Sequence, residues 1–176
     1  MHPVNFRDVG EALSLWVEPP PLPVGRLFRG GGFDTLSRLE DLGHPKTILN
    51  LRRGPDPDHL GVRVIDVPAP DGLENYKTDR RHVSDWIRGV LSSLAAPSTQ
   101  WPVYVHCRSG RDRTGVVVAA ALFALGVPSS VIRKEYLLSD GANSVLIARA
   151  LEGLASFKFT GAHGREALQQ SLGVSG

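Results

Sequence analysis

One stretch near the middle of the chain restricts the possible fold more than any other part of the sequence. A short apolar segment at 103–106 (VYVH) is followed by a loop rich in glycine and arginine at 107–113, and then by an almost wholly apolar segment at 114–125. The first segment predicts a buried strand, and the last predicts a helix that is buried on all sides. A buried strand that leads directly into a buried helix is typical of α/β folds, in which ligands bind at the carboxyl ends of the strands.

Strand and helix patterns also alternate along the rest of the chain. Alternating or β-branched runs predict strands at 24–29, 46–51 and 61–67. Capping residues and the helical spacing of apolar residues predict helices at 34–42, 79–94, 129–138 and 143–157. We therefore expect an α/β fold that is three-layer-like, with a small, mostly parallel central sheet flanked by helices and the 107–113 loop between the central strand and a buried helix.

The length of the chain, 176 residues, suits one domain of ordinary size. Residues 1–23 are expected to form an irregular N-terminal arm, which ends in the stiff run PPPLP. Residues 24–160 are expected to form the single domain, and residues 161–176 a weakly specified C-terminal tail.

Composition argues against several functional classes. The formal net charge of +2 is too small to indicate a nucleic-acid partner. The longest uncharged stretch, 114–132, is interrupted by glycine, proline and serine, so stable membrane insertion is not expected, and the N-terminus lacks the apolar core of a signal peptide. The single cysteine, Cys107, excludes an internal disulfide and a cysteine-based zinc cluster. We expect a cytoplasmic protein without a metal or cofactor, and the oligomeric state stays open.

The loop from Cys107 to Arg113 has the composition of an anion cradle. A loop between a strand and a helix directs successive backbone N–H groups inward, and the helix that follows adds the positive end of its dipole. Arg113 can grip two oxygens with its planar guanidinium. Cys107 lies at the bottom of this positive concavity, where a thiol should ionise well below its free pKa of about 8.5. The expected phosphate-binding residues are Arg108, Ser109, Gly110, Arg111 and Asp112.

The amino-acid sequence of this loop resembles the signature motif of a known enzyme superfamily. His106 and Cys107, followed by five residues and then Arg113 and Thr114, resemble the signature loop of the cysteine-dependent protein tyrosine phosphatases. The full run HCRSGRDRTG is similar to the bacterial tyrosine/lipid phosphatases and to dual-specificity enzymes. Three further runs resemble motifs of the bacterial branch: NFRDVG at 5–10, GRLFRG at 25–30 and EYLLS at 135–139.

The resemblance implies a role for each matching residue. Cys107 would attack phosphorus and form a phosphocysteine, while Arg113 and the loop amides would hold the equatorial oxygens. His106 would order the loop and keep the thiolate stable. Thr114 would donate a hydrogen bond to the sulfur during breakdown of the intermediate. The implied reaction is hydrolysis of phosphomonoesters without a metal.

The resemblance also implies a general acid that protonates the leaving group, and three aspartates compete for this role. Asp71 stands before Cys107 at about the separation that the family uses, although its Pro-Asp-Gly setting also suits a plain turn. Asp66 is expected to lie within a strand. Asp112 lies in the signature loop itself, and the bacterial branch supports it. A site with no dedicated acid is the remaining alternative.

The substrate stays open between two groups of phosphomonoesters. Basic residues near the expected site favour phosphoinositides, inositol phosphates or other small polyanions, but interleaved aspartates suit an ordinary solvated surface equally well. Phosphotyrosine, phosphoserine and phosphothreonine proteins are the other group. Two different activities compete with hydrolysis: a rhodanese-type sulfurtransferase, whose loop commonly has one residue fewer before the closing arginine, and a non-catalytic phosphate-binding module.

Overall fold

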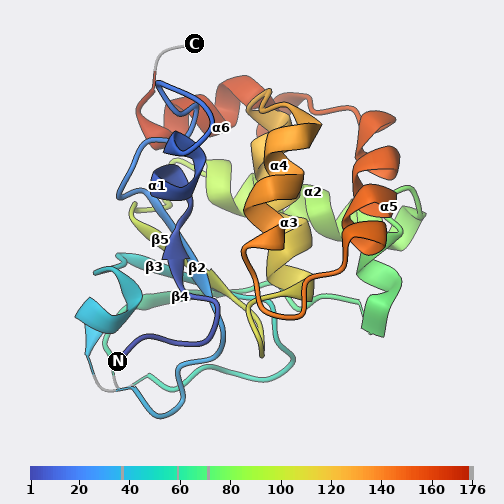
Figure 1. The fold of residues 1–176 in the computed structure, drawn as a ribbon. Coiled ribbons are helices and arrows are strands. Elements are labelled where there is room, and N and C mark those ends of the chain that lie inside the picture. The colour runs from blue at the N-terminus through green and yellow to red at the C-terminus, as the bar shows by residue number, and fades with distance from the viewer. Residues whose placement is uncertain (37, 59, 71, 175–176) are drawn as a thin grey trace.

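A five-stranded sheet forms the centre of the computed structural model, which describes residues 1–36, 38–58, 60–70 and 72–174 (Figure 1). Its strands, in spatial order, are β1 (Arg7–Asp8), β2 (Leu27–Gly30), β5 (Val103–His106), β3 (Thr47–Asn50) and β4 (Arg63–Asp66). All neighbouring pairs are parallel except β1 and β2, which are antiparallel. The predicted α/β fold with a small, mostly parallel sheet is confirmed.

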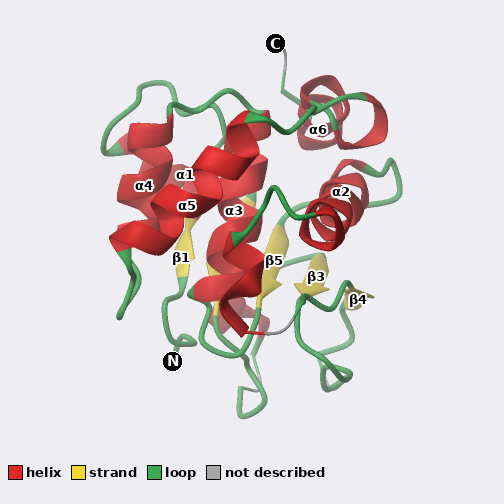
Figure 2. Ribbon diagram, turned by 90° about the vertical axis from the view of Figure 1, so that its right-hand side faces the viewer, coloured by secondary structure: helices red, strands yellow, loops and turns green. Residues whose placement is uncertain are grey.

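The α-helices gather on one side of this sheet in both ribbon views (Figures 1 and 2). They are α1 (Val9–Ser14), α2 (Arg81–Ala95), α3 (Asp112–Ala124), α4 (Ser129–Leu137), α5 (Ser144–Ala155) and α6 (Arg165–Leu172). The described residues also form three short 3₁₀ helices: η1 (Leu39–Leu42), η2 (Gly72–Tyr76) and η3 (Gly161–His163). A smaller apolar cluster on the other face contains Phe33, Leu42, Ile48 and Tyr104, so η1 and loops cover that face in the described part of the chain.

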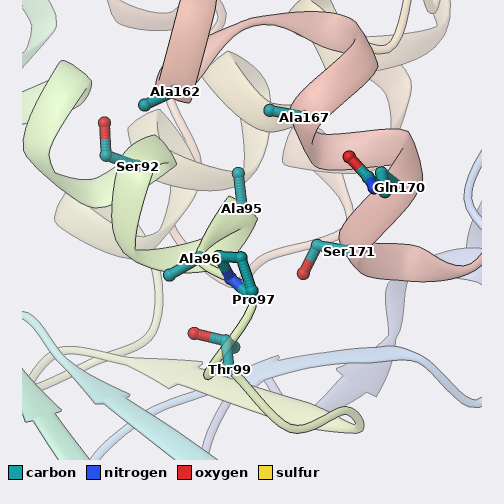
Figure 3. A pocket seen from close by; sticks show the side chains of 9 residues that line it. All are labelled: Ser92, Ala95, Ala96, Pro97, Thr99, Ala162, Ala167, Gln170 and Ser171. Atoms are coloured by element: carbon teal, nitrogen blue, oxygen red, sulfur yellow. The ribbon is translucent and has the colours of Figure 1, made fainter.

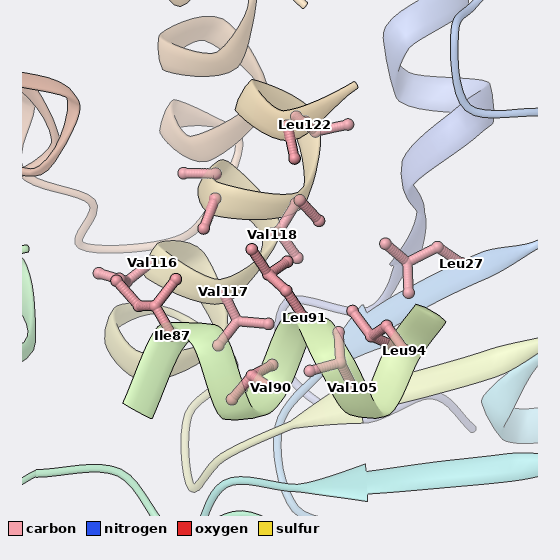
Figure 4. Close-up of a cluster of buried hydrophobic side chains, with 14 of the residues drawn as sticks. Leu27, Ile87, Val90, Leu91, Leu94, Val105, Val116, Val117, Val118 and Leu122 are labelled. Atoms are coloured by element: carbon pink, nitrogen blue, oxygen red, sulfur yellow. The ribbon is translucent and has the colours of Figure 1, made fainter. Parts of the chain in front are cut away.

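The apolar segment after the glycine- and arginine-rich loop is α3, and it is buried as expected. Val117 and Val118 of α3 pack among Val90 and Leu91 of α2 and Val105 of β5 (Figure 4). Full burial of one such side chain contributes about 1.5–3 kcal/mol, so this contact fixes the helix firmly over the sheet. Within the described residues, no helix is long and apolar enough to span a bilayer.

The expected helix at 34–42 is largely absent. Among its described residues only Leu39–Leu42 are helical, as the 3₁₀ turn η1. Asp34, the expected capping residue, instead receives hydrogen bonds from the guanidinium of Arg52 at 2.9 and 3.2 Å. The side chain of Asp34, which would have capped the helix, is therefore engaged in a long-range ion pair. Ser37, within the expected helix, lies outside the described residues.

The prediction of an irregular arm at 1–23 is wrong for residues 7–14, which form β1 and α1. The carboxylate of Asp8 caps α1 by accepting from the amides of Gly10 and Glu11 at 2.8 and 3.3 Å. The antiparallel pairing of β1 with β2 also orders this segment. Because the two strands are separated in the sequence, their pairing leaves no strong local pattern in either segment.

The expectation of a weakly specified tail at 161–176 is also wrong for η3 and α6. Leu168 and Leu172 of α6 are buried in the main core. The hydroxyl of Ser171 donates to the carbonyl of Leu94 at 2.9 Å and accepts from the indole of Trp101 at 2.9 Å. Contacts with α2 thus order a segment whose own sequence pattern is weak.

Candidate active site

The glycine- and arginine-rich loop follows the central strand β5. In the register of the sheet, His106 at the end of β5 lies beside Gly30 of β2 and Asn50 of β3. The loops that leave β2 and β3 therefore start next to the 107–113 loop. Because parallel strands end at the same edge, three separate segments meet around Cys107.

Three consecutive carbonyl groups of the loop are held from outside. The amide of Gly32 donates to the carbonyl of Arg108 at 3.1 Å. The Asn5 side chain donates to the carbonyl of Ser109 at 2.9 Å, and the Arg29 guanidinium donates to that of Gly110 at 2.8 Å. In a trans peptide the carbonyl and the following N–H point in opposite directions. The next three amides therefore face the inside of the loop, as an anion cradle requires.

A buried ionic cluster holds Arg29 in this position. Arg29 is fully buried, and its Nη1 lies 3.1 and 2.8 Å from the two carboxylate oxygens of Glu135. Arg7 donates to the same carboxylate at 2.8 Å. Burial and the charge of Arg29 lower the pKa of Arg7, although Glu135 opposes the shift. Asn5, Arg7, Arg29 and Glu135 belong to the runs NFRDVG, GRLFRG and EYLLS, so these runs bracket the loop.

Gly110 has a backbone conformation that the loop cannot form with another residue. Its φ is +66°, in the left-handed region that favours glycine. A Cβ atom at this position would lie 2.2 Å from the carbonyl carbon of Gly30. The close approach of the two backbones lets Arg29 reach the Gly110 carbonyl.

The sulfur of Cys107 is buried at the bottom of the loop, with only 1% of the residue exposed. Burial opposes ionisation, but hydrogen bonds from the hydroxyl and amide of Thr114, the charge of Arg113 and the amide of Gly110 outweigh it. The pKa of Cys107 is therefore lowered. The buried Thr114 hydroxyl has no oxygen or nitrogen partner among the described residues, which leaves it available to the sulfur.

His106 belongs to a chain of charged side chains that sequence reasoning missed. Its Nε2 lies 2.7 Å from a carboxylate oxygen of Asp56, and its Nδ1 lies 3.3 Å from the carbonyl oxygen of Cys107. The other oxygen of Asp56 accepts from Arg52 at 2.5 Å, and Arg52 also pairs with Asp34. Asp56 stands in the run RGPDPD, which predicts only a turn. The one available signal is its place in the loop after a strand next to the central one.

Both carboxylate oxygens of Asp112 accept hydrogen bonds from neighbouring side chains. One carboxylate oxygen accepts from the Tyr76 hydroxyl at 2.7 Å, and the other accepts from the Arg111 guanidinium at 2.9 and 3.1 Å. The Tyr76 hydroxyl also lies 2.6 Å from that of Tyr136. Burial and these two hydrogen bonds raise the pKa of Tyr76 far above its ordinary value, so this phenol stays neutral. The guanidinium of Arg111 is used in the ion pair with Asp112.

Arg113 borders two cavities. The first, of about 310 Å³, is also lined by Pro70, Gly72, Leu73 and Asp112. The second, of about 370 Å³, is also lined by Gly32, Asp34, Arg52, Arg53 and Arg108. The mouth of the site thus has one side that is partly apolar and one side that is rich in arginine.

Of the other two candidate general acids, Asp66 is among the described residues and Asp71 is not. Asp71 lies outside the described residues; its sequence neighbours Pro70 and Gly72 line the first cavity with Arg113. Asp66 lies at the end of β4, as expected, and accepts from the Asn50 side chain at 2.8 Å. That hydrogen bond gives Asp66 a structural partner in the sheet.

Two further observations concern what lies outside the site and whether a metal ion could bind. A cavity of about 560 Å³ between the end of α2 and α6, lined by Ala95, Pro97, Gln170 and Ser171 among others, contains none of the expected site residues (Figure 3). Among the described residues, no group of three or more histidine, cysteine, aspartate or glutamate side chains is arranged to hold a metal ion.

Comparison with known proteins agrees with the geometry. The family model of the tyrosine phosphatase family matches residues 2–173. The triple specificity protein phosphatase PtpB of Mycobacterium tuberculosis is 47% identical over 89 residues, which cover 47% of this chain and 31% of that protein. The chain therefore spans less than a third of the length of this relative.

Two solved structures share the fold. The core catalytic domain of the PP-IP phosphatase Siw14 from S. cerevisiae has a TM-score of 0.65 at 18% identity, covering 98% of this chain and 96% of that one. P. aeruginosa TpbA has a TM-score of 0.56 at 21% identity, covering 82% and 86%. At these identities the likeness shows the fold alone.

Proposed function

The chain belongs to the tyrosine phosphatase family, and from this premise we propose that it hydrolyses phosphate monoesters through a phosphocysteine on Cys107. The observation that carries the proposal is the position of a buried sulfur, with a lowered pKa, beneath a loop whose carbonyls are held outward. Such a loop presents its amides to a tetrahedral anion, and the sulfur faces the phosphorus of that anion.

The reaction needs two displacements at phosphorus. The thiolate of Cys107 attacks, an S–P bond forms, and the P–O bond to the leaving group breaks. Arg113 and the inward amides hold the three equatorial oxygens through both transition states. Water then attacks phosphorus, the S–P bond breaks, and inorganic phosphate leaves. The hydroxyl of Thr114 donates to the sulfur as it leaves with the electron pair, which stabilises the returning thiolate.

The leaving oxygen requires a proton, and the attacking water later gives one up. We assign both tasks to Asp71, because its sequence neighbours border the cavity beside Arg113. Asp112 lies at the same cavity and is the alternative. Both of its oxygens already accept hydrogen bonds, from Tyr76 and Arg111, which favours Asp71.

The arginine-rich side of the mouth supports substrates that carry more than one negative group. Among the described residues, four arginines and one carboxylate, that of Asp34, line this cavity; the arginines are Arg52, Arg53, Arg108 and Arg113. A cavity of this composition attracts polyanions. The relatives' names include a triple specificity protein phosphatase and a PP-IP phosphatase, and we extend both classes to this chain: phosphorylated proteins and phosphorylated inositols. The single unpaired cysteine suits the reducing cytoplasm, which we propose as its location.

A substrate panel tests the proposal. Phosphate release is measured from phosphopeptides, phosphoinositides, inositol polyphosphates and nucleotides, and the substrates are ranked by kcat/KM. The Cys107→Ser variant is the matched control, because it keeps the cradle and removes the nucleophile. Turnover by the native chain and none by this variant supports the proposal. Equal turnover by both proteins, or none by the native chain on any substrate, contradicts it.

A further inference from the structure

Four of the exposed large hydrophobic side chains form an apolar rim around the mouth of the candidate site. Their exposed fractions are 52% for Val4, 57% for Leu73, 48% for Leu138 and 73% for Val145. A single exposed apolar side chain is ordinary on a protein surface, whereas a group of them beside a polar site marks a surface that binds a partner. The position of each member relative to the signature loop, residues 107–113, is therefore informative.

Two members of the apolar rim border the signature loop directly. A Cβ atom on Gly31 would lie 2.7 Å from Cγ1 of Val4 and 3.0 Å from the carbonyl oxygen of Arg108, so the valine and the loop flank the same glycine. Leu73 lines the cavity of about 310 Å³ that Arg113 also lines. Val4 and Leu73 thus approach the loop from two segments that are far apart in the sequence.

The turn between α4 and α5 carries the other two members. Leu138 directly follows α4, and Val145 lies in the first turn of α5. Between them, the amide of Asp140 donates to the Asn5 side chain at 2.8 Å, and the same side chain donates to the carbonyl of Ser109 in the signature loop. This turn lies at the same end of the molecule as the start of α3 (Figure 1). Both residues are therefore held near the mouth of the site.

The centre that the apolar rim surrounds is positively charged. Among the described residues, four arginines and one carboxylate line the cavity of about 370 Å³ at the mouth, and that carboxylate, on Asp34, pairs with Arg52 at 2.9 Å. Binding to a bilayer surface combines buried apolar area with attraction to anionic headgroups. A phosphopeptide supplies a phosphate without a continuous apolar surface around it, so an anionic bilayer is the partner that uses both features.

We infer that this face docks on an anionic phospholipid bilayer, with the apolar rim in the interface and the arginines over the headgroups. A phosphorylated headgroup projects from the acyl boundary, so it can enter a recessed basic centre while the rim stays in contact with the bilayer. The inference rests on the proposed function for the reaction at the headgroup. The docking itself requires no turnover and can be measured without it.

Vesicle binding by Cys107→Ser tests the docking. Sedimentation compares vesicles of phosphatidylcholine and phosphatidylserine with vesicles of phosphatidylcholine alone, and only the anionic vesicles should bind strongly. Neither lipid is a phosphomonoester, so their binding measures the surface and not the reaction. Leu138→Gln combined with Val145→Gln should weaken binding to the anionic vesicles about tenfold, because two apolar side chains leave the interface.

The matched control removes two exposed apolar side chains at the other end of the molecule. Leu15 and Val24 are 67% and 57% exposed, and they belong to the segment between α1 and β2, beside α6 (Figure 1). Leu15→Gln combined with Val24→Gln should bind the anionic vesicles as the parent does. Thermal denaturation of both double variants checks that each is folded.

Turnover separates the bilayer from a free headgroup as the source of the phosphate. In the chain that keeps Cys107, Leu138→Gln with Val145→Gln should lower kcat/KM for a phosphatidylinositol phosphate in vesicles about tenfold, through KM. Hydrolysis of the corresponding water-soluble inositol phosphate should stay unchanged, because both residues lie outside the cradle.

Three results overturn the inference: no preference for anionic vesicles, an equal loss of binding in the two double variants, or an equal fall in turnover of a soluble phosphopeptide. The last result would assign the apolar rim to a protein partner. Normal vesicle binding by a chain that hydrolyses no substrate would contradict only the proposed function. Hydrolysis of the soluble inositol phosphate by a chain that binds no vesicles would contradict only the docking.

Discussion

Arg29 donates a hydrogen bond of 2.8 Å to the carbonyl oxygen of Gly110, and it does so from a position with no exposed surface. This contact joins β2 to the loop that surrounds Cys107. It turns one peptide of the loop so that its amide faces inward. The guanidinium is therefore part of the structure that forms the cradle, although it lies outside the cradle.

The Arg29→Lys variant should lose both stability and activity. A lysine ammonium cannot reach the Gly110 carbonyl and both oxygens of Glu135 together. Loss of one charged hydrogen bond costs about 2 kcal/mol, which corresponds to a fall in Tm of about 4–8 °C for a chain of this size. We expect kcat to fall by more than KM rises, because the cradle is distorted. Arg26→Lys is the control, since Arg26 donates to the Leu172 carbonyl on α6; an equal loss of kcat there would contradict the prediction.

The Gly110→Ala variant should be inactive and less stable. A methyl group there would lie 2.2 Å from the carbonyl carbon of Gly30, so the loop or β2 must move. Gly61 also has a positive φ, +62°, but a Cβ atom there meets nothing within 4 Å. Gly61→Ala should therefore cost only the conformational strain of about 1–2 kcal/mol and keep its turnover. Thermal denaturation and phosphate release compare the two variants, and similar behaviour of both would show that the contact with Gly30 is unimportant.

The choice between Asp71 and Asp112 can be decided by the leaving group. Asp71→Asn should reduce kcat at least about tenfold for alkyl phosphates, because a general acid contributes most when the leaving group is poor. The reduction should be smaller for an aryl phosphate with a good leaving group. A change below about twofold for both substrates would transfer the role to Asp112, and Asp112→Asn would then show the same dependence on the leaving group.

Ionisation of Cys107 should make the stability of the chain depend on pH. A thiol whose pKa is lowered in the folded state adds stability that is complete above its unfolded pKa, near 8.5. That stability is lost as the pH falls through the lowered pKa of the folded chain. The difference in Tm between the native chain and Cys107→Ser should therefore increase with pH up to about 8.5 and then level off. A difference that is constant or decreases over this range would mean that the thiol is not ionised in the fold.

The parts of this protein that the sequence predicts are those with a strong local pattern. Residues 103–106 and the apolar helix after the loop were predicted because each forms its pattern within one segment. The spacing of Cys107 and Arg113 within one short run is likewise a local pattern, and it predicts the signature loop. No local pattern indicates Asp56, because its partner His106 lies far away in the sequence and only the order of the sheet brings the two together. The same reason explains β1, whose two residues pair with β2.

The N-terminal runs show an intermediate case. The resemblance of NFRDVG and GRLFRG to family motifs marked them as related to the site, but gave no physical role. The structure supplies one: the side chains of Asn5 and Arg29 donate hydrogen bonds to carbonyl groups of the loop. Hydrogen bonds to backbone groups of a distant loop leave no pattern in the residues that donate them.

The most direct test of the account is to identify the group that receives the phosphoryl. The native chain is mixed with substrate, quenched in acid during turnover, digested and analysed by mass spectrometry. One phosphorylated peptide, modified on Cys107, should appear during turnover, disappear when the substrate is exhausted and never form in Cys107→Ser. Turnover with the phosphoryl on another residue, or with continued hydrolysis by Cys107→Ser, would contradict it.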